Sequence, residues 1–219
     1  MQPIGVIFDL DGVLIDSEGL QYAAYSRVLE RFGAGVSETE YAAHWIAEGR
    51  GPEYAVAAFK LPLGPDELRA LKGPVYHDLL RQEVALMPGA AAALARLAPH
   101  FELAVATNSK RVDVDFVIER FALRPLFPVV VTREDYARAK PEPDAYQTAA
   151  VRMALPVGQC VVVEDSFRGV VAAHRAGAAV IAVPNRFTRG SDFSLAAAVL
   201  PGLDALSVDL VASLATRRA

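Results

Sequence analysis

The sequence predicts an α/β fold, namely a doubly wound, Rossmann-like parallel sheet with an inserted all-helical segment. Short, continuous apolar runs recur along the chain with helix-like stretches between them, at residues 4–8, 103–106, 129–131, 160–163 and 179–183. Such runs are typical of parallel strands that helices bury on both faces. Residues 17–86, in contrast, carry helical patterns punctuated by glycines and no convincing strand. A helical insertion is therefore expected after the first strand.

The individual elements follow in chain order. The first strand ends at Asp9, and the insertion is expected to form helices over 18–32, 37–47, 52–60 and 65–84. Between the later strands we expect helices over 90–97, 110–121, 143–153 and 168–176. The last of these is followed by Gly177, a residue favoured just after helix C-termini. The sequence thus predicts two domains: an α/β core formed by residues 1–16 and 87–219, and a helical cap formed by residues 17–86.

The composition indicates a globular protein. Hydrophobic residues make up 53% and charged residues 22% of the 219 residues, which excludes a disordered chain. The net charge of −4 comes without a basic stripe, so we expect no nucleic-acid partner. We also expect no membrane partner, because no run of about 18 apolar residues is present. No basic residue precedes the first apolar run, as it would in a signal peptide, and Cys160 is the single cysteine. We therefore expect a cytoplasmic protein. A monomer is the default expectation for its assembly.

Four polar clusters lie where predicted strands or stiff loops end, which is where open α/β sheets bind ligands. They are Asp9 with Asp11, Thr107-Asn108-Ser109, Lys140 in a loop with two prolines, and Glu164 with Asp165. Taken singly, such clusters are also typical of turns, helix N-caps and solvated loops. Together they supply carboxylates for a divalent cation, a hydroxyl and amides for an oxyanion, and a lysine that balances charge. Phosphoryl transfer needs these parts.

Other ligand-binding motifs do not fit the chain. It contains no Walker-type phosphate-binding loop. Gly33-Ala34-Gly35 follows a helix rather than a strand, and Glu38 stands where a dinucleotide-binding fingerprint has its third glycine. An EF-hand loop needs glycine at its sixth position, whereas Gly12 is fourth when counted from Asp9.

The four clusters match the motifs of a known family. The matching segments are FDLDGVLIDSE (8–18), ATNSKR (106–111), KPEPDAY (140–146) and VVVEDSFRGVVAAHRAG (161–177). In these segments, and in their order, the chain resembles the haloacid dehalogenase-like superfamily. It is most similar to the subfamily with a helical cap after the first motif, which includes phosphoglycolate phosphatases and β-phosphoglucomutases.

The resemblance implies a role for each motif residue. Asp9 is expected to be the nucleophile that becomes an aspartyl phosphate, and Asp11 the general acid and then base. Thr107 and the amide of Asn108 are expected to hold the phosphoryl oxygens, with Lys140 as the counter-charge. A carboxylate that attacks a phosphate dianion meets charge repulsion, which agrees with a need for such cations.

The resemblance also implies a Mg²⁺ cofactor. Asp9, Asp165 and the backbone carbonyl of Asp11 are expected to be ligands, and Glu164 is expected to ligate the ion directly or through water. Oxygen ligands of this kind suit Mg²⁺.

The function implied is a phosphatase that hydrolyses a small phosphorylated metabolite, such as a sugar phosphate or phosphoglycolate. The alternative is a sugar-phosphate mutase like β-phosphoglucomutase. Gln21 aligns with the cap histidine of those mutases and Pro52 with their substrate-loop arginine, while Arg50 and Lys72 remain as substitutes. Gln21, Arg50 and Lys72 are therefore the candidate substrate contacts of the cap.

A more remote alternative is a phosphoacceptor signalling module. Receiver domains also combine an acidic pair, a Thr or Ser, a Lys-Pro and a phosphorylated aspartate on a parallel sheet. They place the acidic pair first, whereas Glu164 and Asp165 come last here and a helical segment is inserted. A phosphatase is therefore the favoured interpretation.

Overall fold

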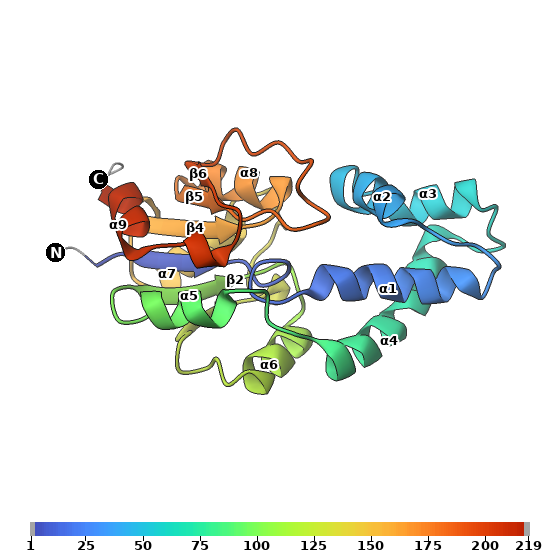
Figure 1. The fold of residues 1–219 in the computed structure, drawn as a ribbon, viewed down its shortest axis with the longest axis horizontal. Helices are drawn as coiled ribbons and strands as arrows, with labels where there is room; N and C mark the ends of the chain where they lie inside the picture. Colours follow the sequence, from blue (N-terminus) through green and yellow to red (C-terminus); the bar gives the residue numbers. More distant parts are fainter. Residues whose placement is uncertain (1–2, 217–219) are drawn as a thin grey trace. The chain divides into compact units, whose positions relative to one another are not determined.

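The computed structural model describes residues 3–216, which form two compact units (Figure 1). The α/β unit contains the described residues up to Ile15, Leu86–Asn185, and those from Ser191 onward. The helical unit contains Asp16–Ala85 together with Arg186–Gly190. The two ends of the expected core, residues 1–2 and 217–219, lie outside the described part of the chain.

The α/β unit is built on a six-stranded sheet in which all neighbouring strands are parallel. The strands are β1 (Gly5–Phe8), β2 (Glu102–Ala106), β3 (Val129–Val131), β4 (Cys160–Glu164), β5 (Ala179–Ala182) and β6 (Ala198–Val199). Their order, β3-β2-β1-β4-β5-β6, confirms the predicted doubly wound fold. The order reverses between β1 and β4, and sheets of this kind bind ligands outside the carboxyl ends of the strands at that point.

Helices cover both faces of this sheet, and apolar side chains pack between the helices and the strands. The helices are α5 (Ala90–Leu97), α6 (Arg111–Arg120), α7 (Asp144–Arg152), α8 (Phe167–Ala176) and α9 (Val208–Thr216). Apolar residues of α7 and α8 form one core with Ile7, Val162 and Val180 of the strands. Because side chains alternate along a strand, Phe8 points to the opposite face, where its ring meets Phe127 edge-on at 6.1 Å between centroids.

The expected and observed elements of this unit agree closely. The five strands and four helices expected from the sequence end within one residue of the observed bounds. The unexpected elements are β6, α9 and three short 3-10 helices, at Arg133–Asp135, Val157–Gln159 and Leu203–Ala205. Strand β6 has only two residues, which is too short to show an alternating pattern.

The helical unit differs from the expectation in one of its helices. It contains α1 (Ser17–Glu30), α2 (Glu38–Tyr41), a π-helix (Ala42–Ala47), α3 (Gly51–Ala58) and α4 (Pro65–Glu83). The single helix expected over 37–47 is therefore α-helical only at its start. At the end of the π-helix, the Glu48 N–H donates at 3.1 Å to the carbonyl of Ala43, five residues earlier, which is the hydrogen-bond spacing of a π-helix. In this wider turn Trp45 stacks on Tyr41 with 5.3 Å between ring centroids.

The helical unit also contains a segment that the sequence analysis assigned to the core. Phe187, in Arg186–Gly190, is buried in the aromatic cluster of this unit. Its ring lies 5.9 Å from that of Tyr22 and 5.4 Å from that of Tyr41, measured between centroids. Contacts between residues far apart in the sequence determine that Phe187 packs in the helical unit, and a local sequence pattern does not reveal such contacts. The division into a catalytic core and a cap stays a prediction.

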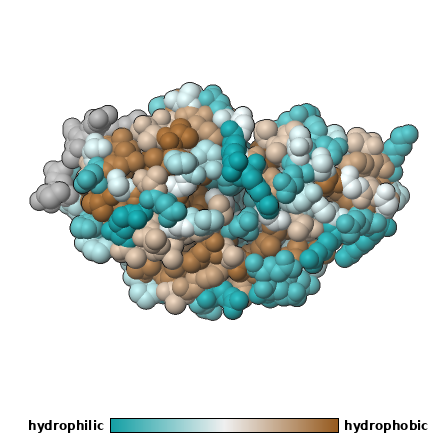
Figure 2. All heavy atoms as spheres, viewed as in Figure 1, coloured by the Kyte–Doolittle hydropathy of each residue, from teal (hydrophilic) through white to brown (hydrophobic). Residues whose placement is uncertain are grey.

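The described surface carries few large exposed apolar side chains. They are Leu71, Val112, Val151, Phe167, Leu195 and Val199. Figure 2 shows hydrophobic residues interspersed with hydrophilic ones on the visible face. No helix within residues 3–216 combines the length and the apolar character that crossing a membrane requires.

Candidate active site

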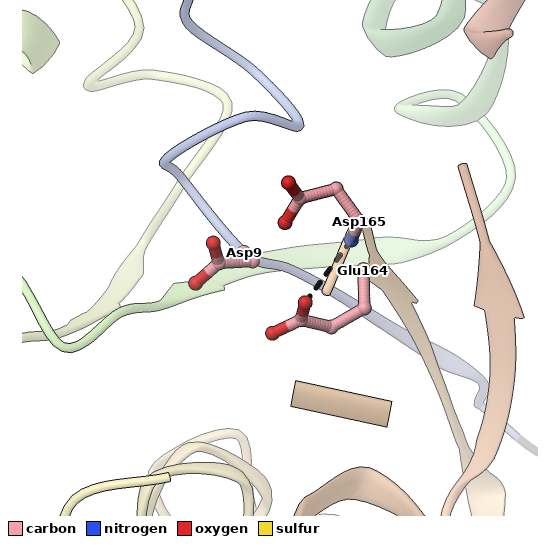
Figure 3. A group of neighbouring side chains, drawn as sticks. All are labelled: Asp9, Glu164 and Asp165. Carbon is pink, nitrogen blue, oxygen red and sulfur yellow. Dashed lines mark hydrogen bonds between the residues drawn. The ribbon is translucent and has the colours of Figure 1, made fainter. Parts of the chain in front are cut away.

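Three carboxylates meet where the strand order of the sheet reverses. Asp9 follows β1, and its N–H donates to the Val163 carbonyl of β4 at 2.9 Å, which continues the parallel ladder. Glu164 ends β4, and Asp165 follows it. One carboxylate oxygen from each of the three acidic residues lies within 4.8 Å of the others, and all three residues are buried (Figure 3). Buried carboxylates this close repel one another, so the cluster fits a divalent cation.

The Lys140 ammonium lies beside this cluster. It donates to Asp9 Oδ1 at 2.5 Å, to Glu164 Oε1 at 2.8 Å and to the Ala106 carbonyl at 3.0 Å. Its side chain is only 4% exposed, and the three acceptors match its three donors. The structure thus places Lys140 where it offsets part of the negative charge on Asp9 and Glu164.

The Glu164 carboxylate is saturated with hydrogen bonds from the protein. Oε1 accepts from Lys140 and, at 2.6 Å, from the Tyr146 hydroxyl. Oε2 accepts from the N–H groups of Asp165 and Ser166 and from the Ser166 hydroxyl, at 3.0–3.1 Å. We infer that Glu164 holds Lys140 and the loop after β4, and that a cation would rest on Asp9 and Asp165.

The electrostatics of the cluster show an excess of negative charge. Burial raises the pKa of Asp9 to about 8. The nearby Lys140 ammonium lowers this pKa, and the Glu164 and Asp11 carboxylates raise it further. Burial alone would lower the pKa of Lys140, but the Asp9 and Glu164 carboxylates hold it above its usual range. A divalent cation would supply the positive charge that one lysine does not.

The loop after β2 carries hydroxyl groups that contact Asp11. Buried Thr107 donates through Oγ1 to Asp11 Oδ2 at 2.9 Å, and the Ser109 hydroxyl donates to the same oxygen at 2.6 Å. The structure thus brings Asp11 and Thr107 together. Ser109 is a further contact of Asp11 that the sequence does not single out, because serine at a helix start is also typical of an N-cap.

The Asn108 side chain braces this loop. Its Oδ1 accepts from the Tyr136 hydroxyl at 2.7 Å and from the Lys140 N–H at 3.2 Å. The Tyr136 hydroxyl also lies 2.8 Å from the Thr107 carbonyl. Burial raises the pKa of Tyr136 to about 12, so this hydroxyl remains a donor at neutral pH. Among the described residues, none accepts a hydrogen bond from the Asn108 N–H, the group expected to hold a phosphoryl oxygen.

Comparison with known proteins identifies the family. Residues 6–183 match the family model of the haloacid dehalogenase-like hydrolases. The chain belongs to this family. The family resemblance predicted from its four motifs is therefore confirmed, and this haloacid dehalogenase-like hydrolase acts on phosphate esters.

Relatives of this hydrolase include sugar-phosphate enzymes. Protein CbbY of Rhodobacter capsulatus is 30% identical over 226 residues, which cover 98% of this chain and 100% of that protein. A phosphorylated carbohydrates phosphatase of Thermotoga maritima is 32% identical over 177 residues, 78% of this chain and 81% of that protein. A solved structure of a CbbY variant from Rhodobacter sphaeroides, in complex with xylulose-(1,5)bisphosphate, has a TM-score of 0.76 at 27% identity and covers 94% of this chain and 96% of that one.

The candidate substrate contacts in the helical unit of this hydrolase do not form one group. The Lys72 ammonium donates to Gln21 Oε1 and lies 4.6 Å from the centroid of the Tyr76 ring. The third candidate, Arg50, pairs instead with Glu48 at 3.4 Å, and its side chain is 73% exposed. The structure thus brings Gln21 and Lys72 together.

Proposed function

We propose that this hydrolase is a Mg²⁺-dependent phosphatase that forms an aspartyl phosphate on Asp9 while hydrolysing a small phosphorylated metabolite. One observation carries the proposal. Buried Asp9 lies 2.5 Å from the Lys140 ammonium and within 4.8 Å of the Glu164 and Asp165 carboxylates, at the reversal point of the sheet. A nucleophile that attacks a phosphate dianion needs such compensation for its charge.

The residues of the site divide the reaction into two displacements. In the first, a carboxylate oxygen of Asp9 bonds to phosphorus while the bond to the leaving oxygen breaks, and Asp11 gives that oxygen a proton. In the second, water attacks phosphorus, the bond to Asp9 breaks, and Asp11 takes up the water proton. The Thr107 hydroxyl and the Asn108 N–H hold the phosphoryl oxygens throughout.

The metal requirement rests on the donor set. Asp9, Asp165 and the Asp11 carbonyl would hold Mg²⁺, with Glu164 acting through water because its oxygens are already occupied. All of these donors are oxygens, as Mg²⁺ prefers. When bound, the ion supplies charge compensation for the phosphoryl group.

Replacing Asp9 tests the proposal. Asp9→Asn is expected to fold and to lose turnover roughly 10³-fold or more, because an amide is a poor nucleophile. Phosphate release from a panel of sugar phosphates, phosphoglycolate, polyol phosphates and nucleotides, with Mg²⁺ and again with excess EDTA, measures the effect. Asp209→Asn, in exposed surface of α9, is the matched control. Near-native activity of Asp9→Asn, or full activity in EDTA, would contradict the mechanism.

The phosphatase is proposed over the mutase on the residues of the helical unit. A mutase must shield its aspartyl phosphate from water and couple Asp11 to the correct sugar. Gln21 has no titratable group for this, and its amide is engaged with Lys72. With β-glucose 1-phosphate and a bisphosphate activator, phosphorus NMR is expected to show free phosphate. Glucose 6-phosphate forming much faster than free phosphate would overturn the assignment.

The finer identity of the substrate, the location and the assembly state are also proposals. Relatives named for phosphorylated carbohydrates and solved with xylulose-(1,5)bisphosphate support testing sugar phosphates first. The buried, unpaired Cys160 supports a cytoplasmic location, and we propose a monomer. Cell fractionation and size-exclusion chromatography with light scattering test these two points.

A further inference from the structure

Asp165 has a partner that the sequence analysis does not single out. The side-chain amide of Asn185 donates from Nδ2 to Asp165 Oδ2 at 2.7 Å. Both residues belong to the α/β unit. Asp165 is 5% exposed and Asn185 is half-buried, so the hydrogen bond is largely screened from solvent.

The backbone around this pair is fixed on two sides. The ladder between β4 and β5 continues past the strand ends, since the Val183 N–H donates to the Glu164 carbonyl at 2.7 Å. Asn185 therefore lies only two residues after Val183, whose backbone this hydrogen bond holds in place. Gly12 packs against the pair, because a Cβ at this position would overlap Asp165 Oδ2 and lie 2.7 Å from Asn185 Nδ2. The two side chains thus meet in a space that the surrounding chain defines.

The Asp165 carboxylate needs such a restraint. It lies in a cluster with the Asp9 and Glu164 carboxylates, which repel it. The Asn185 amide restrains one of its oxygens without adding charge to the cluster. Partners that orient metal-binding carboxylates in this way affect both the geometry and the affinity of the site.

We propose that Asn185 is a positioning residue for the cation of this hydrolase: by donating to Asp165 Oδ2, it restrains the rotation of the carboxylate that would bind the metal. This inference rests on the proposed function, which includes the divalent cation. Asn185 itself is not proposed as a ligand.

Metal binding by the intact protein tests the inference without using activity. The probe is Mn²⁺, titrated into the protein and followed by the EPR signal of the unbound ion. Asn185→Ala is expected to weaken Mn²⁺ binding about 10-fold, within the range usual for loss of such a partner. Asn185→Leu removes the donor at similar volume and adds no charge, so it is also expected to bind Mn²⁺ more weakly than the wild type.

Three controls separate positioning from a loss of structure. Asp192→Asn changes an exposed side chain in the same connection between β5 and β6 and is expected to leave Mn²⁺ binding unchanged. Thermal unfolding in EDTA is expected to be similar for Asn185→Ala and wild type, and a saturating Mg²⁺ concentration is expected to restore the activity of this variant.

The outcomes separate this inference from the proposed function. If wild-type protein does not bind Mn²⁺, the metal-dependent function itself fails. If wild-type protein binds Mn²⁺ and both Asn185 variants bind it equally well, only the positioning role is overturned. Tighter binding by either variant would also overturn it, because the Asn185 amide would then oppose metal binding.

Discussion

A single carboxylate, Asp135, joins three segments of the α/β unit. It follows β3 and accepts hydrogen bonds from the Thr132 N–H at 2.7 Å, from Arg111 at 2.5 Å and from Arg152 at 2.8 Å. Burial alone would raise its pKa, but the hydrogen bonds from Arg152 and Thr132 hold the pKa well below its usual range. The ionised form of Asp135 therefore stabilises the fold.

The effect of Asp135 on stability is expected to depend on pH. Since its pKa is lower in the folded than in the unfolded chain, the stabilisation is complete above about pH 4 and is lost as the pH falls toward the folded value. Asp135→Asn is expected to lower the free energy of unfolding by about 2 kcal/mol at pH 7, and by progressively less below pH 4. Urea unfolding of both proteins from pH 7 to pH 2 measures this difference. A difference that stays constant over that range would contradict the prediction.

Also at the residue level, the sequence identifies charged site residues more readily than their partners. Asp9, Lys140 and Asp165 stand out because charged side chains beside strand ends or stiff loops need a functional reason. Tyr136 and Asn185 do not stand out, since a tyrosine or an asparagine after a strand is compatible with many loops. Their hydrogen bonds join residues 28 and 20 positions apart, and only the folded chain brings them together.

Helix α8 shows how one glycine fits an element to the site. Gly169 lies in its first turns, directly against Glu164, and a Cβ there would overlap the Glu164 carboxyl group. The Glu164 side chain cannot give way without losing its bonds to Lys140, Tyr146 and Ser166. Gly73 of α4 offers a comparison, because a Cβ at that position meets nothing within 4 Å.

These two glycines are expected to respond differently to the same substitution. Gly169→Ala is expected to lower the free energy of unfolding by roughly 2 kcal/mol or more through overpacking, and to reduce phosphatase activity. Gly73→Ala is expected to stay within about 1 kcal/mol of wild type, since the helical preference of alanine is offset by the following Pro74. Chemical denaturation and phosphate release measure both effects. Equal responses of the two variants would show that contact with Glu164 does not matter.

Patterning predicts elements where they are long and regular. Strands β1 to β5 and helices α5 to α8 of the α/β unit have clear apolar patterns and ends, and the sequence predicts them within one residue, whereas β6 and α9 were not expected. The π-helix at Ala42–Ala47 has no such signal, because its apolar residues also suit an α-helix. Its register follows from the packing of Trp45 against Tyr41 and the Gly51 backbone.

At the scale of the whole molecule, Phe187 contributes to the core of the helical unit from far along the chain. It is 5% exposed, and its ring contacts those of Tyr22 and Tyr41. Trp45, the single tryptophan, stacks on Tyr41 in the same cluster. The fluorescence of Trp45 therefore reports on the packing of this unit.

Removing the Phe187 ring is expected to destabilise the helical unit. Phe187→Ala is expected to cost about 3–5 kcal/mol, the usual range for deleting a buried aromatic ring. The midpoint of the Trp45 fluorescence transition in denaturant measures the change. Phe167→Ala, which removes a ring that is 44% exposed, is the control and is expected to shift the midpoint far less. Similar shifts for both variants would contradict a core role for Phe187.

The position of Arg186–Gly190 has a consequence for recombining this protein with its relatives. The chain passes between the two units four times, at residues 15–16, 85–86, 185–186 and 190–191. A hybrid made by exchanging only residues 16–85 would carry a foreign aromatic cluster together with its original Phe187. The helical unit is therefore best exchanged by moving two separate stretches of sequence at once, residues 16–85 and 186–190, because a hybrid that receives only the longer stretch is expected to be destabilised for a reason unrelated to catalysis.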